Sequence, residues 1–117
     1  MAREYGRNQR VADQVQRELA VVIQRELTQE LGMITLSATD VSPDMKNAKV
    51  YFTFLQQTKE LDAVALQARL NDMAGHFRHH LAKTLPLKMV PRLTFIYDES
   101  IERANRLNAL LDSVKQD

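Results

Sequence analysis

The side chains best suited to chemistry gather between residues 69 and 92. This stretch holds three histidines and five lysine or arginine residues, with Asp72 as its only acid, although the whole chain carries a net charge of only +1. Histidine can bind a metal ion, whereas lysine and arginine bind anions such as phosphate. A run of charge can also be no more than a solvated surface. The stretch could thus be a metal site, an anion-binding surface or a plain solvated face.

A metal site would need ligands from elsewhere in the chain. His76 has the helical spacing of a metal-binding pair with His79 or His80, but no glutamate stands where a general base is required. The chain has no cysteine, and its three glycines are scattered, so it forms no phosphate-binding loop. No serine lies in the sequence context of a nucleophile elbow. We therefore predict no enzyme activity, no metal and no cofactor.

Nucleic acid is the better candidate for the ligand of this stretch. Its phosphates are bound by lysine, by arginine and by the N–H groups of helix N-termini. The predicted contact residues on and after the basic helix are Gly75, Arg78, His79, Lys83, Lys88 and Arg92. A second set of cations near the N-terminus consists of Arg3, Arg7 and Arg10.

Gly75 is the unusual residue of the basic helix, because glycine in a helix interior costs about 1 kcal/mol relative to alanine. A break at Gly75 would create a new helix N-terminus, with free N–H groups beside Arg78, His79 and Lys83. Alternatively, Gly75 only permits close packing against the first helix. The residues alone leave both interpretations open.

Helical periodicity predicts the elements that must position these residues. A first helix runs from Asn8 to Leu31 and stops at Gly32. A second helix has its N-cap at Thr58, contains the glycine just described and must end before Pro86. A third helix starts at Ser100. Its apolar seam consists of Ile101, Ala104, Leu107, Leu111 and Val114.

Alternation of apolar and polar residues predicts three strands, over residues 33–41, 48–55 and 92–97. The first two form a hairpin around the turn SPDMKN. On the first strand, one side should carry Ile34, Leu36 and Ala38, and the other Thr35, Ser37 and Thr39. We expect the first helix and the broken helix to pack on one face of the sheet. The core should then contain Val50, Phe52, Phe54, Leu70, Phe77 and Leu93.

The length of 117 residues suits one domain, which we place at 3–115, with short flexible ends at 1–2 and 116–117. No apolar run approaches the roughly eighteen residues of a membrane span. The N-terminus lacks the apolar segment of a secretory signal. Without cysteine there are no disulfides or thiolate zinc sites. We expect a cytoplasmic protein with no membrane partner.

Three segments resemble the ribosome-binding factor A family in order and spacing. They are GRNQRVADQVQRELAVVIQREL, VSPDMKNAKVYFTFL and MAGHFRHHLAKTLPLKMVPRLTFIYDES. The resemblance covers about residues 3–115 and implies an α+β, KH-like (type II) fold: α–β–β–α–kink–α–β with a C-terminal helix and a three-stranded sheet. In this family, Ala-x-Gly at the kink replaces the RNA-clamping GXXG loop of ordinary KH domains. Gly75 would be the kink glycine, although Met73 stands at the family's alanine position.

The resemblance also implies a function without catalysis. It suggests a ribosome assembly factor that binds the free small (30S) ribosomal subunit and supports late maturation and 5′-end processing of 16S rRNA, which matters most in the cold. The implied partners are the small subunit, its 16S rRNA and a GTPase assembly factor linked to release. We expect the chain itself to be a monomer.

Two other functions remain open. One is a general KH-like single-stranded RNA-binding protein without ribosome preference, and the other is a protein-interaction module. General single-strand binders expose aromatic side chains on which bases stack. Most of the aromatic residues here are predicted to face inward, which favours recognition of RNA backbone and shape.

Overall fold

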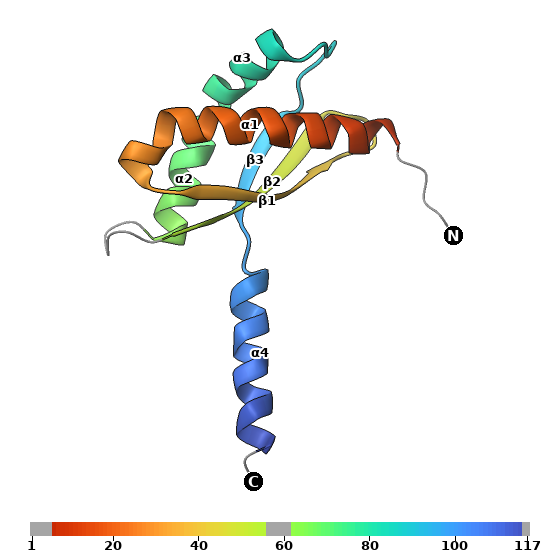
Figure 1. Cartoon of the computed structure of the whole chain (residues 1–117). Coiled ribbons are helices and arrows are strands. Elements are labelled where there is room, and N and C mark those ends of the chain that lie inside the picture. Colours follow the sequence, from red (N-terminus) through yellow and green to blue (C-terminus); the bar gives the residue numbers. More distant parts are fainter. Residues whose placement is uncertain (1–5, 56–61, 116–117) are drawn as a thin grey trace.

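The computed structural model describes residues 6–55 and 62–115 (Figure 1). The elements are α1 (Arg7–Leu31), β1 (Ile34–Val41), β2 (Asn47–Phe54), α2 (Ala63–Asp72), α3 (Ala74–Thr84), β3 (Arg92–Tyr97) and α4 (Ser100–Lys115). This order confirms the predicted α+β, KH-like type II arrangement with a C-terminal helix. The predicted bounds of the first helix and of all three strands agree with the structure to within one residue.

The three strands form one mixed sheet in the order β1-β2-β3. β1 and β2 are antiparallel, with Ile34 opposite Phe54, which confirms the predicted hairpin. β2 and β3 are parallel, with Asn47 opposite Arg92. Parallel neighbours require a crossover connection, and α2 with α3 supplies it.

A β-bulge at Ser37 changes the faces predicted for β1. The pairing of β1 with β2 shifts between Leu36 and Ala38. One extra residue reverses the direction of every side chain that follows it. Ala38 is therefore exposed on the open face of the sheet, whereas Thr39 and the buried Val41 lie on the helix side. The prediction that Ala38 shares the face of Leu36 was wrong.

Helices α1, α2 and α3 cover one face of the sheet and bury one apolar core (Figure 1). The predicted core residues that are buried are Val50, Phe52, Leu70, Phe77 and Leu93. Phe54 is only half-buried, because it ends β2 beside the exposed Leu55; its ring packs edge-on against Tyr97, with centroids 5.9 Å apart. Full burial of both Phe52 and Phe77 confirms the faces predicted for β2 and for the second helical region.

The second helical region breaks at Met73, not at Gly75. Met73, with φ −92° and ψ 6°, both ends α2 and caps α3. Gly75 lies one residue inside α3 from Ala74, and it is not among the residues with positive φ. A Cβ at Gly75 would meet no atom within 4 Å. Neither a break at Gly75 nor close packing against α1 therefore explains this glycine.

Two side chains of α2 hydrogen-bond the free edge of β3. The Asn71 amide donates to the carbonyl oxygen of Phe95 (3.0 Å) and accepts from the N–H of the same residue (2.7 Å). Gln67 Oε1 accepts from the N–H of Tyr97 (2.8 Å). An edge strand otherwise presents unpaired backbone groups to solvent. Because α2 ends just after Asn71, the break lets this residue cover the sheet edge.

The caps of the helices confirm one prediction and revise another. Gly32 ends α1 with φ 82°, a left-handed conformation that glycine adopts readily. α2 begins at Ala63, with Asp62 Oδ1 accepting from the N–H of Ala65 (2.8 Å). The N-cap of α2 is therefore Asp62. Thr58, the predicted N-cap, lies outside the described residues.

Helix α4 projects away from the rest of the molecule (Figure 1). Residues 101–114 are all exposed, including the predicted apolar seam. The Asp98 carboxylate holds the root of α4, accepting from Ser37 Oγ (2.6 Å) and from the N–H of Ser100 (2.9 Å). These bonds lower the pKa of Asp98. Within the described residues, no helix has the length and apolarity to cross a membrane.

Candidate nucleic-acid interface

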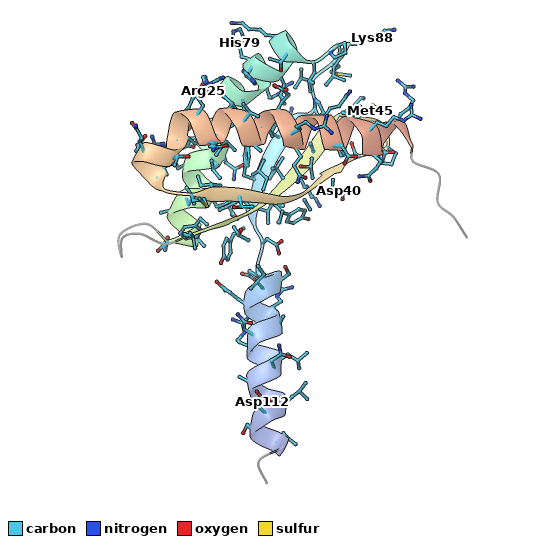
Figure 2. All side chains as sticks on the ribbon, viewed as in Figure 1. Arg25, Asp40, Met45, His79, Lys88 and Asp112 are labelled. Atoms are coloured by element: carbon cyan, nitrogen blue, oxygen red, sulfur yellow. The ribbon has the colours of Figure 1, made fainter. Side chains whose placement is uncertain are left out.

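The end of α3 and the loop after it carry most of the predicted contact residues. His79 and Lys83 are exposed on α3, Lys88 is exposed in the 85–91 loop, and Arg92 is exposed at the start of β3. Figure 2 shows His79 and Lys88 extending outward at the end of the molecule opposite α4. This end of the molecule therefore presents cations to solvent.

Arg78 fixes the loop that carries Lys88. Its guanidinium donates from Nε to the carbonyl oxygen of Pro91 (3.2 Å) and from Nη2 to that of Val90 (3.1 Å). Pro91 is buried, so this end of the loop is anchored in the body. Arg78 thus has a structural role in addition to the phosphate contact predicted for it.

The N-terminal cations approach the same end from α1. Arg7 is the first residue of α1 and Arg10 lies in its first turn; both are exposed. Arg7 and Lys88 line one hollow of about 470 Å³. Sequence reasoning treated them as members of two separate sets, and the fold joins them. Arg3, the remaining predicted contact, lies outside the described residues.

The turn between β1 and β2 supplies residues to this interface that sequence reasoning missed. Asp44 Oδ1 accepts from Ser42 Oγ (2.6 Å) and from the N–H of Lys46 (3.0 Å), and these bonds lower the pKa of Asp44. Met45 has φ 64°, a left-handed conformation unusual for a side chain of its size. The N–H of Arg92 donates to the carbonyl oxygen of Lys46 (2.8 Å). The sequence did not single out Lys46 as a contact residue, because the nearby Asp44 balances its charge.

Another part of the basic helix face is paired with acids of α1. His76 Nε2 lies 2.7 Å from Glu26 Oε1. His80 Nε2 lies 3.4 Å from Glu18 Oε1, and Arg69 Nη2 lies 2.7 Å from Glu30 Oε1. These glutamates lie eight and four residues apart on α1, so they form one stripe facing α2 and α3. This side of the basic face stabilises helix packing and offers little charge to a ligand.

His79 differs from the other two histidines, since no hydrogen bond or ion pair of its side chain occurs within residues 6–55 and 62–115. In the same residues, no three histidine, aspartate or glutamate side chains converge to hold a metal ion. His76 and His80 instead each face a single glutamate.

The fold and the exposed cations define a KH-like domain of type II with a basic end. Residues 7–111 match the family described as Ribosome-binding factor A. A curated Ribosome-binding factor A from Stutzerimonas stutzeri (strain A1501) is 46% identical over 114 residues, covering 96% of this chain and 88% of that protein. The chain therefore belongs to the ribosome-binding factor A family.

Solved structures agree with this assignment. The crystal structure of ribosome-binding factor A from Thermus thermophilus has a TM-score of 0.67 and 22% identity, covering 80% of this chain and 97% of that one. A homology model of the Thermus thermophilus protein, fitted into a cryo-EM map of its 30S complex, has a TM-score of 0.62 and 23% identity, covering 75% of this chain and 91% of that one. At these identities the likeness establishes the fold.

Proposed function

We propose that this protein is a ribosome assembly factor that binds the free small (30S) ribosomal subunit. The observation that carries the proposal is family membership at 46% identity over nearly the whole chain. It is supported by the 30S complex of the Thermus thermophilus protein, which has the same fold. The protein supports late maturation and 5′-end processing of 16S rRNA, chiefly in the cold, where misfolded RNA rearranges slowly.

The proposed contact surface is the cationic end of the molecule. Its described residues are Arg7, Arg10, Gly75, Arg78, His79, Lys83, Lys88 and Arg92, to which we add Lys46. Arg3, which lies outside the described residues, is proposed as a further contact. Lysine and arginine position a protein on RNA through the phosphates. The large aromatic rings of Phe52, Phe77 and Phe95 are fully buried, so they are not a platform for stacking bases. Recognition then rests mainly on backbone and shape.

In this proposal the protein acts as a single 3–115 domain that is a monomer and binds without catalysis. Binding at the cationic end holds an rRNA element in one conformation, and release follows when the mature subunit no longer offers that conformation. A GTPase assembly factor is the proposed partner in release. No metal or cofactor takes part in these steps.

Sedimentation of cell lysate tests the proposal. The protein should migrate with free small subunits and be absent from assembled ribosomes, and cells that lack it should accumulate 16S precursor with an unprocessed 5′ end at low temperature. Spreading over all RNA-containing fractions would show instead a general single-strand binder. Migration only with free protein would contradict both functions.

A further inference from the structure

The hollow shared by Arg7 and Lys88 lies where the start of α1, the β1–β2 turn and the 85–91 loop meet. Its volume is about 470 Å³, within the range of about 300–1,000 Å³ of small-molecule sites. Its apolar lining consists of Val11, Pro43, Met45, Pro86, Leu87 and Met89. Figure 2 shows Lys88 and Met45 on neighbouring segments at this end of the molecule.

The charged side chains of the hollow do not form ion pairs with one another. Among the described residues, the charged side chains that line it are those of Arg7, Lys88 and Asp44. The ion pairs within the described residues include none of these three side chains, so each charge is available to a ligand. The hollow thus combines an apolar surface, two cations and one carboxylate.

Asp44 holds its carboxylate in a defined orientation. Both hydrogen bonds that it accepts, from Ser42 and Lys46, go to Oδ1. Among the described residues no hydrogen bond to Oδ2 is found, which leaves that oxygen as an acceptor for N–H donors of a ligand. Its position is set by a turn in which Met45 takes a left-handed conformation.

We infer that this hollow binds one unpaired guanine nucleotide of the RNA. The inference rests on the proposed function and identifies a ligand of the same surface. The apolar lining would contact the base, Arg7 and Lys88 would bind its phosphates, and Asp44 would accept N–H donors of its Watson–Crick edge. Proteins read RNA sequence chiefly on such unstacked bases, by contact with the ring and hydrogen bonds to its edge.

Guanine fits a carboxylate better than the other bases do. Its N1–H and N2–H donors are adjacent and can both point at the same carboxylate. Adenine and cytosine place a ring nitrogen acceptor beside their amino group, and uracil flanks its single N–H with two carbonyl oxygens. These acceptors would face the negative charge of Asp44, so the site disfavours them.

Chemical-shift titration of the isotope-labelled full chain with GMP, AMP, CMP and UMP tests the inference. GMP should shift the amides of residues 44–46 and 87–89, with an affinity about tenfold higher than that of the other three, which lies within the roughly 1–3 kcal/mol that a specific contact to a base edge supplies. Equal affinity for all four nucleotides, or the same shifts with inorganic phosphate, would overturn it.

Asp44→Asn provides the sharper variant. The asparagine oxygen still accepts from Ser42 and Lys46, so the turn is kept, while the carboxylate charge is lost. The tenfold preference for GMP should disappear. Asp40→Asn is the matched control, because Asp40 is an exposed carboxylate on β1 opposite Lys49, away from the hollow. Persistence of the preference in Asp44→Asn would contradict the assigned role.

The two proposals fail in different ways. A protein that migrates with free small subunits but shows no GMP preference would refute the guanine site and retain the proposed function. A GMP preference without migration on small subunits would retain the site and refute the function. Lys88→Ala should weaken the binding of all four nucleotides to a similar extent, because the Lys88 ammonium contacts the phosphate and not the base.

Discussion

Gly75 shows how a single residue can be tested for a purely local effect. Its φ is not positive, and a Cβ there meets nothing within 4 Å. Gly75→Ala should therefore increase the free energy of unfolding, by up to about 1 kcal/mol, through helix propensity alone. Denaturant unfolding measures this change. A loss of stability would show that the backbone near Gly75 is packed more closely than the structure indicates.

The same variant tests whether bare backbone at Gly75 touches RNA. The residue is exposed and lies at the start of α3, four residues before His79. If Gly75→Ala is more stable yet binds small subunits less tightly, the added methyl group must obstruct a contact. Unchanged binding would remove Gly75 from the proposed contact surface.

Tyr97 offers a prediction about pH. Its hydroxyl donates to Glu102 Oε1 (2.6 Å), and this bond raises the pKa of Tyr97 to about 12. Because the folded-state value lies above the ordinary value of 10.0, the bond contributes stability below about pH 10 and loses it as the pH rises towards 12. Tyr97→Phe should cost about 1 kcal/mol at neutral pH, and the difference should vanish at strongly alkaline pH. Thermal unfolding across this pH range is the measurement.

A tyrosinate absorbance titration is the independent check on Tyr97. The intact protein should show a tyrosinate step near pH 12, which belongs to Tyr97. That late step should be missing from Tyr97→Phe. If Tyr97 titrated near its ordinary value of 10.0, the bond to Glu102 would not persist in solution.

At the scale of elements, Asn71 links α2 to the edge of β3. Asn71→Ala removes two hydrogen bonds and leaves the partly buried N–H and C=O of Phe95 unpaired. We expect a loss of about 2–3 kcal/mol in unfolding free energy, because each unsatisfied group costs its desolvation. Asn105→Ala, on the exposed surface of α4, is the control and should change stability little. Equal effects of the two substitutions would refute the role of Asn71.

Helix α4 should be dispensable for folding of the rest. Residues 101–114 are all exposed, and the hydrogen bonds at the root of α4 join Glu102 to Tyr97 and Ser100 to Asp98. An isolated helix of 16 residues is marginal in water. Removal of residues 100–117 should therefore lower the unfolding free energy by only about 1–2 kcal/mol, the value of the two lost root hydrogen bonds. A large loss in denaturant unfolding would mean that α4 folds back onto the body.

At the scale of the whole molecule, the exposed cations of one end can be tested together. Lys83, Lys88 and Arg92 are exposed at the cationic end, whereas α1 pairs its glutamates with the helices beside it. Subunit binding weakens as salt rises, and the slope of log K against log salt concentration measures this dependence. Replacing these three cations with alanine should make the slope shallower by up to about three, since each phosphate contact contributes roughly 0.7 to 0.9. Arg78 is left intact, because it anchors the loop.

A triple variant elsewhere serves as the control for total charge. Arg25→Ala, Lys49→Ala and Arg106→Ala remove the same charge from α1, the open sheet face and α4. Binding measured at several salt concentrations should keep its slope in this variant. If both triple variants flatten the slope equally, the protein binds through overall charge, and the cationic end is not the contact surface.

The sequence by itself determined the elements whose signal is local. Apolar spacing of three and four along α1, with glycine at its end, and alternation along β2 and β3 specify element type and bounds, because periodicity reflects which face each side chain presents. Phe52 and Phe77 were assigned to the core on this basis and are fully buried. Three segments of the sequence, in the right order, also indicated the family.

The tertiary structure decided which distant side chains meet. The bulge at Ser37 belongs to the pairing of β1 with β2, and the break at Met73 lets Asn71 hydrogen-bond the edge of β3. Both depend on distant partners, so no local pattern revealed them. The sequence placed His76 on the basic helix face as a candidate ligand-binding residue, whereas in the structure Glu26 of α1 lies beside it. Arg7 and Lys88 are 81 positions apart in the chain, and only the packing of α1 against the loop brings them to one hollow. Periodicity assigns a side chain to a face, whereas its partner depends on how whole elements pack.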